Sequence, residues 1–383
     1  MKYYLIAGEP SGDALGARLI EALRRKDKDA QFFGIGGDSM KALGFSSLFD
    51  ISELAVMGIM EVIPSIPRIL KRMNQTIAEI KSLKPDVIIT IDSWSFCARI
   101  HKKIRKLHLN IPQVHYVAPQ VWAWKKKRAR TMYKYIDLLL TLFPNEPQYF
   151  IPNHLPAVFV GHPVIESAVV NAAPKGTFRE RHNIPADKRI MLILPGSRHN
   201  EVKNLLPDFL NAIHKLSAEY PDFVYVLPTV STVAARVKKM LANSTVPALV
   251  VEGEQERRSA FQDADAAIAA SGTVALELAI VKVPHIVAYK VPKLTELLVR
   301  NFLHFRFINL SNILLNRLIV PELLQNHCNP ENIAFYMRQL IEKQPLYNSQ
   351  IEGFEQVRKI LGMGEQIPSD NAAAAILNFI RKQ

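Results

Sequence analysis

The side chains best suited to chemistry stand where apolar runs of the chain end. One such run, residues 191–194, stops at a proline and continues through Gly196, Ser197, Arg198 and, further on, Glu201. The glycine lets the backbone approach a ligand closely, and a helix that starts here offers unpaired N–H groups to an anion. The forked, permanent charge of Arg198 suits phosphate. The stretch predicts an anion-binding turn, although an ordinary strand-to-helix turn with a surface arginine has the same pattern.

A second apolar run, residues 266–269, ends in small residues that precede a helix start. Ser271, Gly272 and Thr273 can present backbone N–H and hydroxyl groups to a diphosphate. Glu277 follows one turn into the helix, where its carboxylate could hold the two hydroxyls of a ribose. The alternative is a helix capped by Ser or Thr that binds no ligand.

A third apolar run ends on a carboxylate. Residues 85–91 are typical of a buried strand, and Asp92 follows directly. Because ligands of open α/β sheets bind at the carboxyl ends of the strands, Asp92 is the best single candidate for a general base. An aspartate that caps the next helix is the alternative interpretation.

A glycine-rich loop follows the first expected strand, residues 3–7, and contains Glu9, Ser11, Gly12 and Asp13. The loop is not of the G-x-G-x-x-G type, so the fingerprint of dinucleotide-binding proteins is not met. Tight packing of a strand against a helix is the alternative role for such a loop.

Two further stretches are rich in apolar or basic residues. Residues 54–73 carry apolar side chains at helical spacing beside a basic face, and residues 122–130 combine Trp122 and Trp124 with five cations. Both are typical either of core-facing helices or of surfaces that contact a membrane interface. The tryptophans could equally stack nucleic-acid bases. Pro64 and Pro67 predict a broken start to the first of these helices.

The composition limits the classes of protein that fit. The chain has 383 residues, 49% of them hydrophobic, and a formal charge of +13, which favours anionic partners such as nucleotides, phosphorylated lipids, acidic membranes or nucleic acid. Cys97 and Cys328 form no cluster with histidines or with each other, so we expect neither a disulfide scaffold nor a metal site. We expect no leader segment, and no apolar run approaches the ~18–20 residues of a spanning helix.

Strand-like and helix-like stretches alternate twice along the chain. This alternation predicts an α/β fold with parallel sheets covered by helices on both faces. Residues 165–187 are rich in alanine, proline and charge and are expected to form a linker. We therefore expect an N-terminal domain at 1–165, joined by the helices from about 345–383, and a C-terminal domain at 185–343.

Several stretches together resemble the lipid-A-disaccharide synthase family, glycosyltransferase family 19. In chain order they are residues 8–13, 53–58, 91–93, 118–124, 194–198, 201, 271–273, 276–277 and 309–312. The resemblance runs over nearly the whole chain. Its Trp-Ala-Trp and Gly-Ser-Arg segments are specific as a set, although each is weak alone.

The resemblance implies a GT-B fold, in which two Rossmann-like domains with parallel sheets face each other across a cleft. It implies a hexosyltransferase that moves 2,3-diacylglucosamine from UDP-2,3-diacylglucosamine to 2,3-diacylglucosamine 1-phosphate (lipid X), with inversion and without a metal or cofactor. The products would be lipid A disaccharide 1-phosphate and UDP, and the C-terminal half would bind the nucleotide. Asp92 falls where the base of the family lies, and Glu9 lies in the catalytic loop on the acceptor side. The acceptor or cleft positions would be Ser11, Gly12, Asp13, Met57, Gln120, Trp122 and Asn312.

The chain departs from the family beside its expected base. The family usually continues with Pro-Asp-Phe two residues after the matching aspartate, whereas this chain has Trp94, Ser95 and Phe96. The second carboxylate of the family is therefore missing. If that carboxylate were the base, the assignment to Asp92 would fail.

The resemblance also implies partners and a location. The enzyme would be cytoplasmic and peripheral on the cytoplasmic face of the inner membrane, where it would contact anionic phospholipid, with a homodimer as a possible assembly and no nucleic acid. One rival is another UDP-sugar enzyme of this architecture, either a glycan glycosyltransferase or an epimerase. The other is a non-catalytic protein that binds a membrane surface or nucleic acid, which the charge and the tryptophans suggest.

Overall fold

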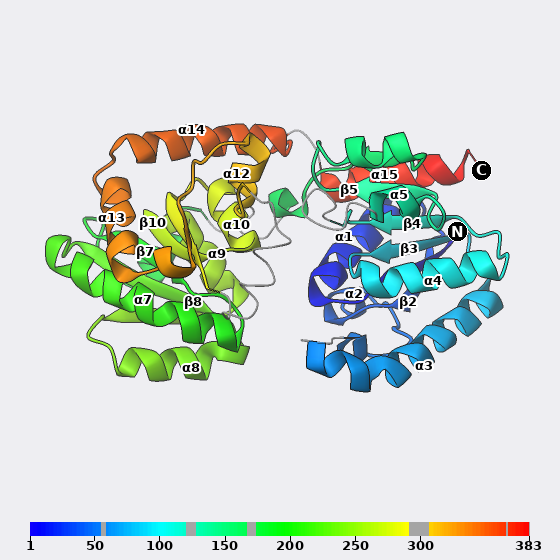
Figure 1. Ribbon diagram of the computed structural model, residues 1–383, viewed down its shortest axis with the longest axis horizontal. Helices are drawn as coiled ribbons and strands as arrows, with labels where there is room; N and C mark the ends of the chain where they lie inside the picture. The colour runs from blue at the N-terminus through cyan, green and yellow to red at the C-terminus, as the bar shows by residue number, and fades with distance from the viewer. Residues whose placement is uncertain (55–58, 120–127, 167–173, 291–305, 365–366, 383) are drawn as a thin grey trace. The chain divides into compact units, whose positions relative to one another are not determined.

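The chain forms two units, each built on its own parallel sheet (Figure 1). The computed structural model describes residues 1–54, 59–119, 128–166, 174–290, 306–364 and 367–382. Unit 1 comprises Met1–Pro163 and Gly364–Gln383, and unit 2 comprises Val164–Met363. The α/β class with parallel sheets, expected from the alternation of strands and helices, is confirmed.

Unit 1 contains a six-stranded sheet in the order β2-β1-β3-β4-β5-β6, and every pairing is parallel. Its central strands are continuous apolar runs because helices cover both faces, which leaves no solvent side for alternate residues. The strands are β1 (Lys2–Ala7), β2 (Gln31–Ile35), β3 (Val87–Ile91), β4 (Gln113–Tyr116), β5 (Leu138–Thr141) and β6 (Ala157–Phe159).

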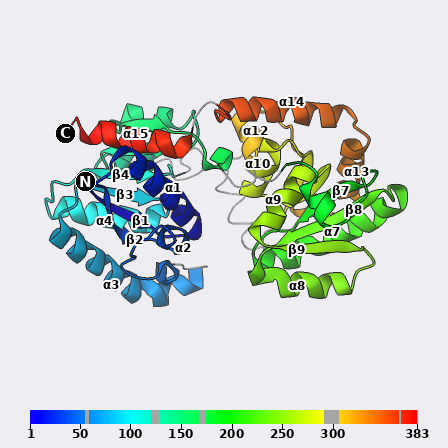
Figure 2. The same cartoon turned by 180° about the vertical axis from the view of Figure 1, so that it is seen from behind.

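The helices of unit 1 lie on the two faces of this sheet. Side chains of α3 and α4 share one core with β1 and β3, while α1 packs beside the C-terminal helix α15 (Figure 2). The helices are α1 (Pro10–Lys26), α2 (Asp38–Lys41), α3 (Ile59–Leu83), α4 (Trp94–Lys106), α5 (Ala129–Met132) and α15 (Pro368–Ile380), with short 3₁₀ turns at Ile51–Leu54, Pro147–Tyr149 and Ile151–Asn153. A further 3₁₀ turn, Pro163–Glu166, begins at the last residue of this part of unit 1 and continues into unit 2.

Two expectations about unit 1 differ from the structure. The expected break at Pro64 and Pro67 is wrong, because α3 starts at Ile59 and includes both prolines. A helix of 25 residues can continue past a proline at the loss of one backbone hydrogen bond for each. The chain returns to unit 1 at residue 364 rather than at about 345, and Arg25 there forms an ion pair of 2.7 Å with Asp370.

Unit 2 repeats the architecture with the strand order β12-β11-β10-β7-β8-β9, again entirely parallel. The strands are β7 (Arg189–Leu194), β8 (Phe223–Thr229), β9 (Ala248–Glu252), β10 (Ala266–Ala270), β11 (His285–Tyr289) and β12 (Glu322–Leu324). The edge strand β12 was not predicted from the sequence, because its three residues are too few to show a strand pattern.

Helices cover both faces of the second sheet (Figure 1). One face packs against α7, α8 and α13, and the other packs against α9 and α10. Helix α14 contacts α10 and α12, which places it in unit 2 and explains the late return of the chain to unit 1. The helices are α6 (Thr177–Arg181), α7 (His199–Glu219), α8 (Ser231–Ala242), α9 (Glu254–Asp263), α10 (Thr273–Ile280), α12 (Leu310–Leu315), α13 (Pro330–Ile341) and α14 (Pro345–Ile360), and a 3₁₀ turn lies at Gln325–His327.

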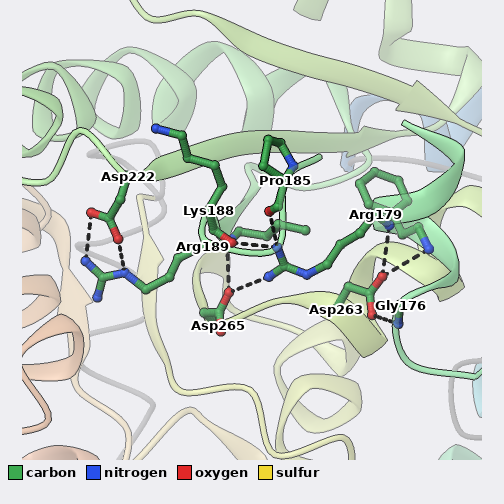
Figure 3. Close-up of polar contacts among 10 residues, drawn as sticks. Gly176, Arg179, Pro185, Lys188, Arg189, Asp222, Asp263 and Asp265 are labelled. Atoms are coloured by element: carbon green, nitrogen blue, oxygen red, sulfur yellow. Dashed lines mark hydrogen bonds and ion pairs between the residues drawn. The ribbon is translucent and has the colours of Figure 1, made fainter. Parts of the chain in front are cut away.

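The expected linker at 165–187 is in part an ordered piece of unit 2. Phe178 in α6 is fully buried in a core of this unit. The carboxylate of Asp263 accepts the backbone N–H groups of Gly176, Phe178 and Arg179, and the Arg179 guanidinium pairs with Asp265 at 3.1 Å (Figure 3). This polar, charged segment therefore belongs to the fold because its backbone N–H groups and the Arg179 charge have carboxylate partners about 85 residues away in the sequence.

Among the helices that the structure describes, none combines the length and the apolar character needed to cross a bilayer.

Candidate active site and nucleotide-binding residues

Asp92 lies directly after β3, in a backbone conformation that is unusual for a residue with a side chain. Its φ angle is +54° and that of Ser93 is +40°. The carboxylate accepts the backbone N–H of Ser93 at 2.8 Å, and Ser93, not Asp92, is the N-cap of α4. Asp92 thus does not cap the helix, which removes the main structural alternative for it. Left-handed residues of this kind cost energy and concentrate at functional sites.

The surroundings of Asp92 favour its protonated form. Burial raises the pKa of the Asp92 carboxyl, and the charge of Glu9 raises it further, while hydrogen bonds from Ser93 and Ser11 act in the opposite direction and are outweighed. The Ser93 hydroxyl donates to Glu9 Oε1 at 3.0 Å, so both carboxylates meet at the same strand end. Two acids held close together raise the proton affinity of the pair, which is the property a general base needs.

Glycines allow the loop at 8–13 to pack against this strand end. A Cβ atom on Gly8 would lie 2.8 Å from the Ser93 hydroxyl oxygen, and one on Gly12 would lie 3.2 Å from the carbonyl oxygen of Ile91. The loop therefore has the tight strand–helix packing that was the alternative interpretation, and this packing is also what brings Glu9 to Asp92.

Asp13 supports the loops rather than facing solvent. Its side chain is 3% exposed, and it accepts the N–H groups of Gly37, Ser39 and Met40 at 2.7, 2.8 and 3.2 Å. It therefore connects the loop at 8–13 to the segment at 37–40. Ser11 is exposed. Met57, Gln120 and Trp122 lie outside the described residues.

A buried polar network, which sequence reasoning missed, lies beneath Asp92. The hydroxyl of Thr90 contacts His101 Nε2 at 2.8 Å and His115 Nδ1 at 2.6 Å, and His101 Nδ1 contacts the Gln113 amide oxygen at 2.7 Å. Burial lowers the pKa of His101 to about 4 and that of His115 well below its ordinary value, so both rings stay neutral. The ring of Trp94 lies tilted against that of His115, with 4.7 Å between the ring centres. This network supports the end of β3 without a charge.

In unit 2, the protein's own carboxylate occupies the start of α7. Glu201 accepts the N–H groups of Ser197 and Arg198 at 3.1 and 3.3 Å and the Arg198 guanidinium at 2.7 Å. Gly196 has a φ of +102°, and a Cβ there would lie 2.3 Å from Glu201 Oε2, so the glycine makes room for this carboxylate. Glu201 therefore holds the loop, while the Arg198 side chain, 67% exposed, is accessible to an anion.

The second small-residue turn leaves its backbone accessible. Ser271 is anchored by its N–H, which donates to the carbonyl of Ala288 at 3.2 Å. Gly272 and Thr273 are exposed at the start of α10, and a Cβ on Gly272 would meet no atom within 4 Å. The N–H groups at this helix start are thus open to an anion.

Glu277 has a partner that the sequence did not reveal. Arg257 in α9 donates to its two carboxylate oxygens at 2.6 and 3.4 Å. Burial lowers the pKa of Arg257, but its hydrogen bonds and charge interactions with Glu254 and Glu277 outweigh burial and raise it. The only sequence signal was the i,i+3 spacing of Glu254 and Arg257, which is common on helix surfaces.

Asn312 is fully buried, and all its polar atoms have partners in unit 2. Its amide donates to the Val320 carbonyl and to Glu322, both at 2.8 Å, and its oxygen accepts the N–H groups of Ile319 and Val320 at 2.9 Å. The side chain thus connects α12 to β12 and to the segment that precedes it. Asn309 caps α12 through Ser311 N at 2.9 Å.

Comparisons with known proteins identify the family of the chain. The family model described as lipid-A-disaccharide synthetase matches residues 3–376. The chain belongs to the lipid-A-disaccharide synthase family. A relative of that name from Paramagnetospirillum magneticum is 44% identical, with 100% of this chain and 98% of the relative covered, and one from Rhodospirillum centenum is 44% identical, with 99% and 95% covered.

Solved structures show the same fold at low sequence identity. A UDP-GlcNAc 2-epimerase from Neisseria meningitidis bound to UDP-GlcNAc has a TM-score of 0.65 at 15% identity and covers 100% of both chains. MurG from Acinetobacter baumannii has a TM-score of 0.59 at 16% identity, covering 100% of this chain and 99% of the other. These similarities confirm the GT-B class, and family membership makes this protein a hexosyltransferase of lipid A biosynthesis.

Among the described residues, no group of three or more His, Cys, Asp and Glu side chains is arranged to hold a metal ion.

Proposed function

We propose that the enzyme transfers 2,3-diacylglucosamine from UDP-2,3-diacylglucosamine to lipid X, with inversion and without a metal. Asp92 takes the proton of the acceptor 6-hydroxyl, and the hydroxyl oxygen forms a bond to C1 of the donor sugar on the face opposite UDP. The bond between C1 and the diphosphate oxygen breaks, and UDP leaves with its electron pair. The observation that carries this proposal is the Asp92 carboxyl beside Glu9, with its raised pKa, at the end of β3.

Unit 2 is the proposed site for UDP. The open turn at Gly272 and Thr273 and the exposed guanidinium of Arg198 can hold the diphosphate as its charge increases during departure. Glu277 lies one turn into α10, where it can accept hydrogen bonds from the ribose hydroxyls. The solved epimerase of this fold, which holds UDP-GlcNAc, supports a nucleotide-sugar ligand.

The substrate assignment is tested by UDP release. We expect UDP to form only when the donor and an acylated acceptor are both present. The donor with a non-acylated glucosamine 1-phosphate is the matched control, and it should give no release above background. Equal release with both acceptors would reject lipid X as the acceptor class, and hydrolysis or epimerisation of the donor alone would favour the rival UDP-sugar enzymes.

We further infer that α3 contacts the cytoplasmic surface of the inner membrane. Ile66 and Leu70 lie one helical turn apart and are each 45% exposed, and Arg68 and Lys71 are exposed beside them. Apolar contact combined with basic attraction to anionic lipid suits reversible docking. The tryptophans at 122 and 124, which were expected to contribute, lie outside the described residues.

Sedimentation with anionic vesicles tests this docking. The double change Ile66→Ser and Leu70→Ser should reduce binding, whereas Phe335→Ser, at a side chain 55% exposed in unit 2, should not. Absence of binding by the unaltered protein at low salt would contradict the proposal.

A further inference from the structure

The carboxylate of Glu277 is held from one side. Its side chain is 16% exposed, and Nη1 and Nη2 of Arg257 donate to Oε2 and Oε1 at 2.6 and 3.4 Å. The two residues come from different helices, α9 and α10, and are separated by 20 positions in the sequence. Each carboxylate oxygen has two lone pairs, so this contact leaves acceptor capacity on the side away from Arg257.

Arg257 is itself fixed in place. Its NH2 and Nε groups donate to Glu254 at 2.9 and 3.2 Å, and its guanidinium carbon lies 5.3 Å from the centre of the Phe261 ring. The side chain is 24% exposed, so solvent screens its pair with Glu277 only in part. A guanidinium with two carboxylate partners and an aromatic face has little freedom to rotate, and it can therefore impose one orientation on Glu277.

Such a support matters for recognition of a ribose. A glutamate has three side-chain torsions, and it binds a pair of neighbouring hydroxyls well only when its carboxylate plane is already oriented. A free carboxylate would lose rotamer entropy on binding, which would weaken its preference for a ligand with two hydroxyls over a ligand with one.

We propose that Arg257 is a positioning residue that orients Glu277 toward the ribose hydroxyls of UDP, and that the pair sets the preference of unit 2 for ribonucleotides over 2′-deoxyribonucleotides. The inference rests on the proposed UDP site. In this role Arg257 does not contact the nucleotide and acts only through Glu277.

The chain supplies a matched control at the next position. Arg258 is in the same helix, has a side chain that is 38% exposed and also bonds to Glu254, at 3.4 Å. Among the contacts of the described residues, Arg258 pairs with Glu254 and not with Glu277. If the helix charge or a Glu254 contact mattered for UDP affinity, substitution of either arginine would lower that affinity. If the orientation of Glu277 matters, only substitution of Arg257 should lower it.

The experiment is a calorimetric titration of UDP and dUDP into the full-length protein and into the variants Arg257→Gln, Arg257→Lys, Arg258→Gln and Glu277→Gln. The unaltered protein should bind UDP about tenfold or more tightly than dUDP, a factor that corresponds to one hydrogen bond to a charged group. Arg257→Gln and Glu277→Gln should bind UDP about tenfold more weakly while their dUDP affinity changes little. Arg258→Gln should keep both affinities. The UDP affinity of Arg257→Lys should lie between that of Arg257→Gln and that of Arg258→Gln.

The ratio of the two affinities separates positioning from general damage. A variant whose site is simply disordered loses affinity for UDP and dUDP alike, and thermal unfolding of each variant checks its fold. If folded Arg257→Gln keeps the UDP preference that Glu277→Gln loses, Arg257 does not position Glu277 and the inference is overturned. If the unaltered protein binds neither nucleotide, the proposed UDP site itself is wrong, which is a distinct result.

Discussion

The strand ends of the two units handle carboxylates in opposite ways. In unit 1, burial and the neighbouring charge of Glu9 dominate at Asp92 and raise its pKa. In unit 2, carboxylates at the corresponding edge have cationic partners: Glu201 pairs with Arg198, Glu277 with Arg257, and Asp208 with Lys290. The first arrangement increases affinity for a proton, and the second holds each carboxylate against a cation in a fixed framework that can receive an anion.

The largest effect expected from this difference is on turnover when Asp92 loses its basicity. Asp92→Asn should lower kcat about 10²–10⁴-fold, the usual contribution of a general base. Steady-state kinetics with donor and lipid X measure it, and thermal unfolding confirms the fold. Near-normal turnover in a folded variant would remove Asp92 as the base.

The missing second carboxylate allows a matched control for this change. Ser95 is exposed and stands at the position where the family usually has aspartate. Ser95→Asp should leave turnover of the unaltered protein nearly unchanged and should not restore Asp92→Asn. Restoration would show that the site at 95 can supply the base, contrary to the assignment.

The next largest effect concerns Arg198, an exposed cation of unit 2. Arg198→Ala should weaken UDP binding about tenfold or more, because a charge-assisted hydrogen bond to the diphosphate is lost. Calorimetry measures this affinity. Arg236→Ala is a control because its guanidinium contacts only the His199 carbonyl, at 3.4 Å, among the contacts described. Unchanged UDP affinity in Arg198→Ala would refute the placement of the diphosphate.

A smaller effect should appear in the pH dependence of turnover. Because the pKa of Asp92 is raised above its ordinary value of 3.8, the acid limb of kcat/KM should lie above that value. Glu9→Gln removes a negative charge next to Asp92, which favours its ionised form, so the limb should move to lower pH. A limb that stays in place would mean that Glu9 does not influence the base.

The last effect is on stability in mild acid, and both units contribute to it. Buried histidines with lowered pKa values lie in unit 1, where those of His101 and His162 fall to about 4 and about 3, and in unit 2, where that of His285 falls to about 4. Each is neutral when folded and gains a proton when unfolded below an ordinary pKa of 6.5. Stability should therefore fall as pH drops from about 6.5 toward about 4, by up to roughly 1.4 kcal/mol per pH unit for each ring.

Substitution of one ring checks the origin of this acid sensitivity. In urea unfolding at pH 7 and pH 5, His101→Gln should lose less stability between the two conditions than the unaltered protein, whatever its stability at pH 7. An identical loss in both proteins would show that His101 does not contribute.

Strands, most helices and the strand-terminal position of Asp92 could be predicted because they depend on local patterns. Apolar runs such as residues 87–91 are buried on both faces, and glycine or carboxylate punctuation marks their ends. The amphipathic pattern of α14, in contrast, says that one face is covered but not by which unit, so the return of the chain at Gly364 could not be located.

The supporting contacts of the site could not be predicted for a related reason. Arg257 and Glu277 are 20 residues apart, and Thr90 and His115 are 25 apart, so only the tertiary fold brings them together. Asp13 and Asn312 are of residue types that often bind ligands, yet both are buried and hydrogen-bonded to backbone groups. Sequence type shows that a polar side chain needs partners but does not say whether those partners are protein or substrate.

The most direct test of this division between the units is one calorimetric series in which UDP is titrated into Asp92→Asn and Arg198→Ala side by side. We expect Asp92→Asn, despite its loss of turnover, to bind UDP with the affinity of the unaltered protein, whereas Arg198→Ala should bind it about tenfold or more weakly. Weakened UDP binding in folded Asp92→Asn, together with unaltered binding in Arg198→Ala, would contradict the assignment of base and nucleotide site to different units.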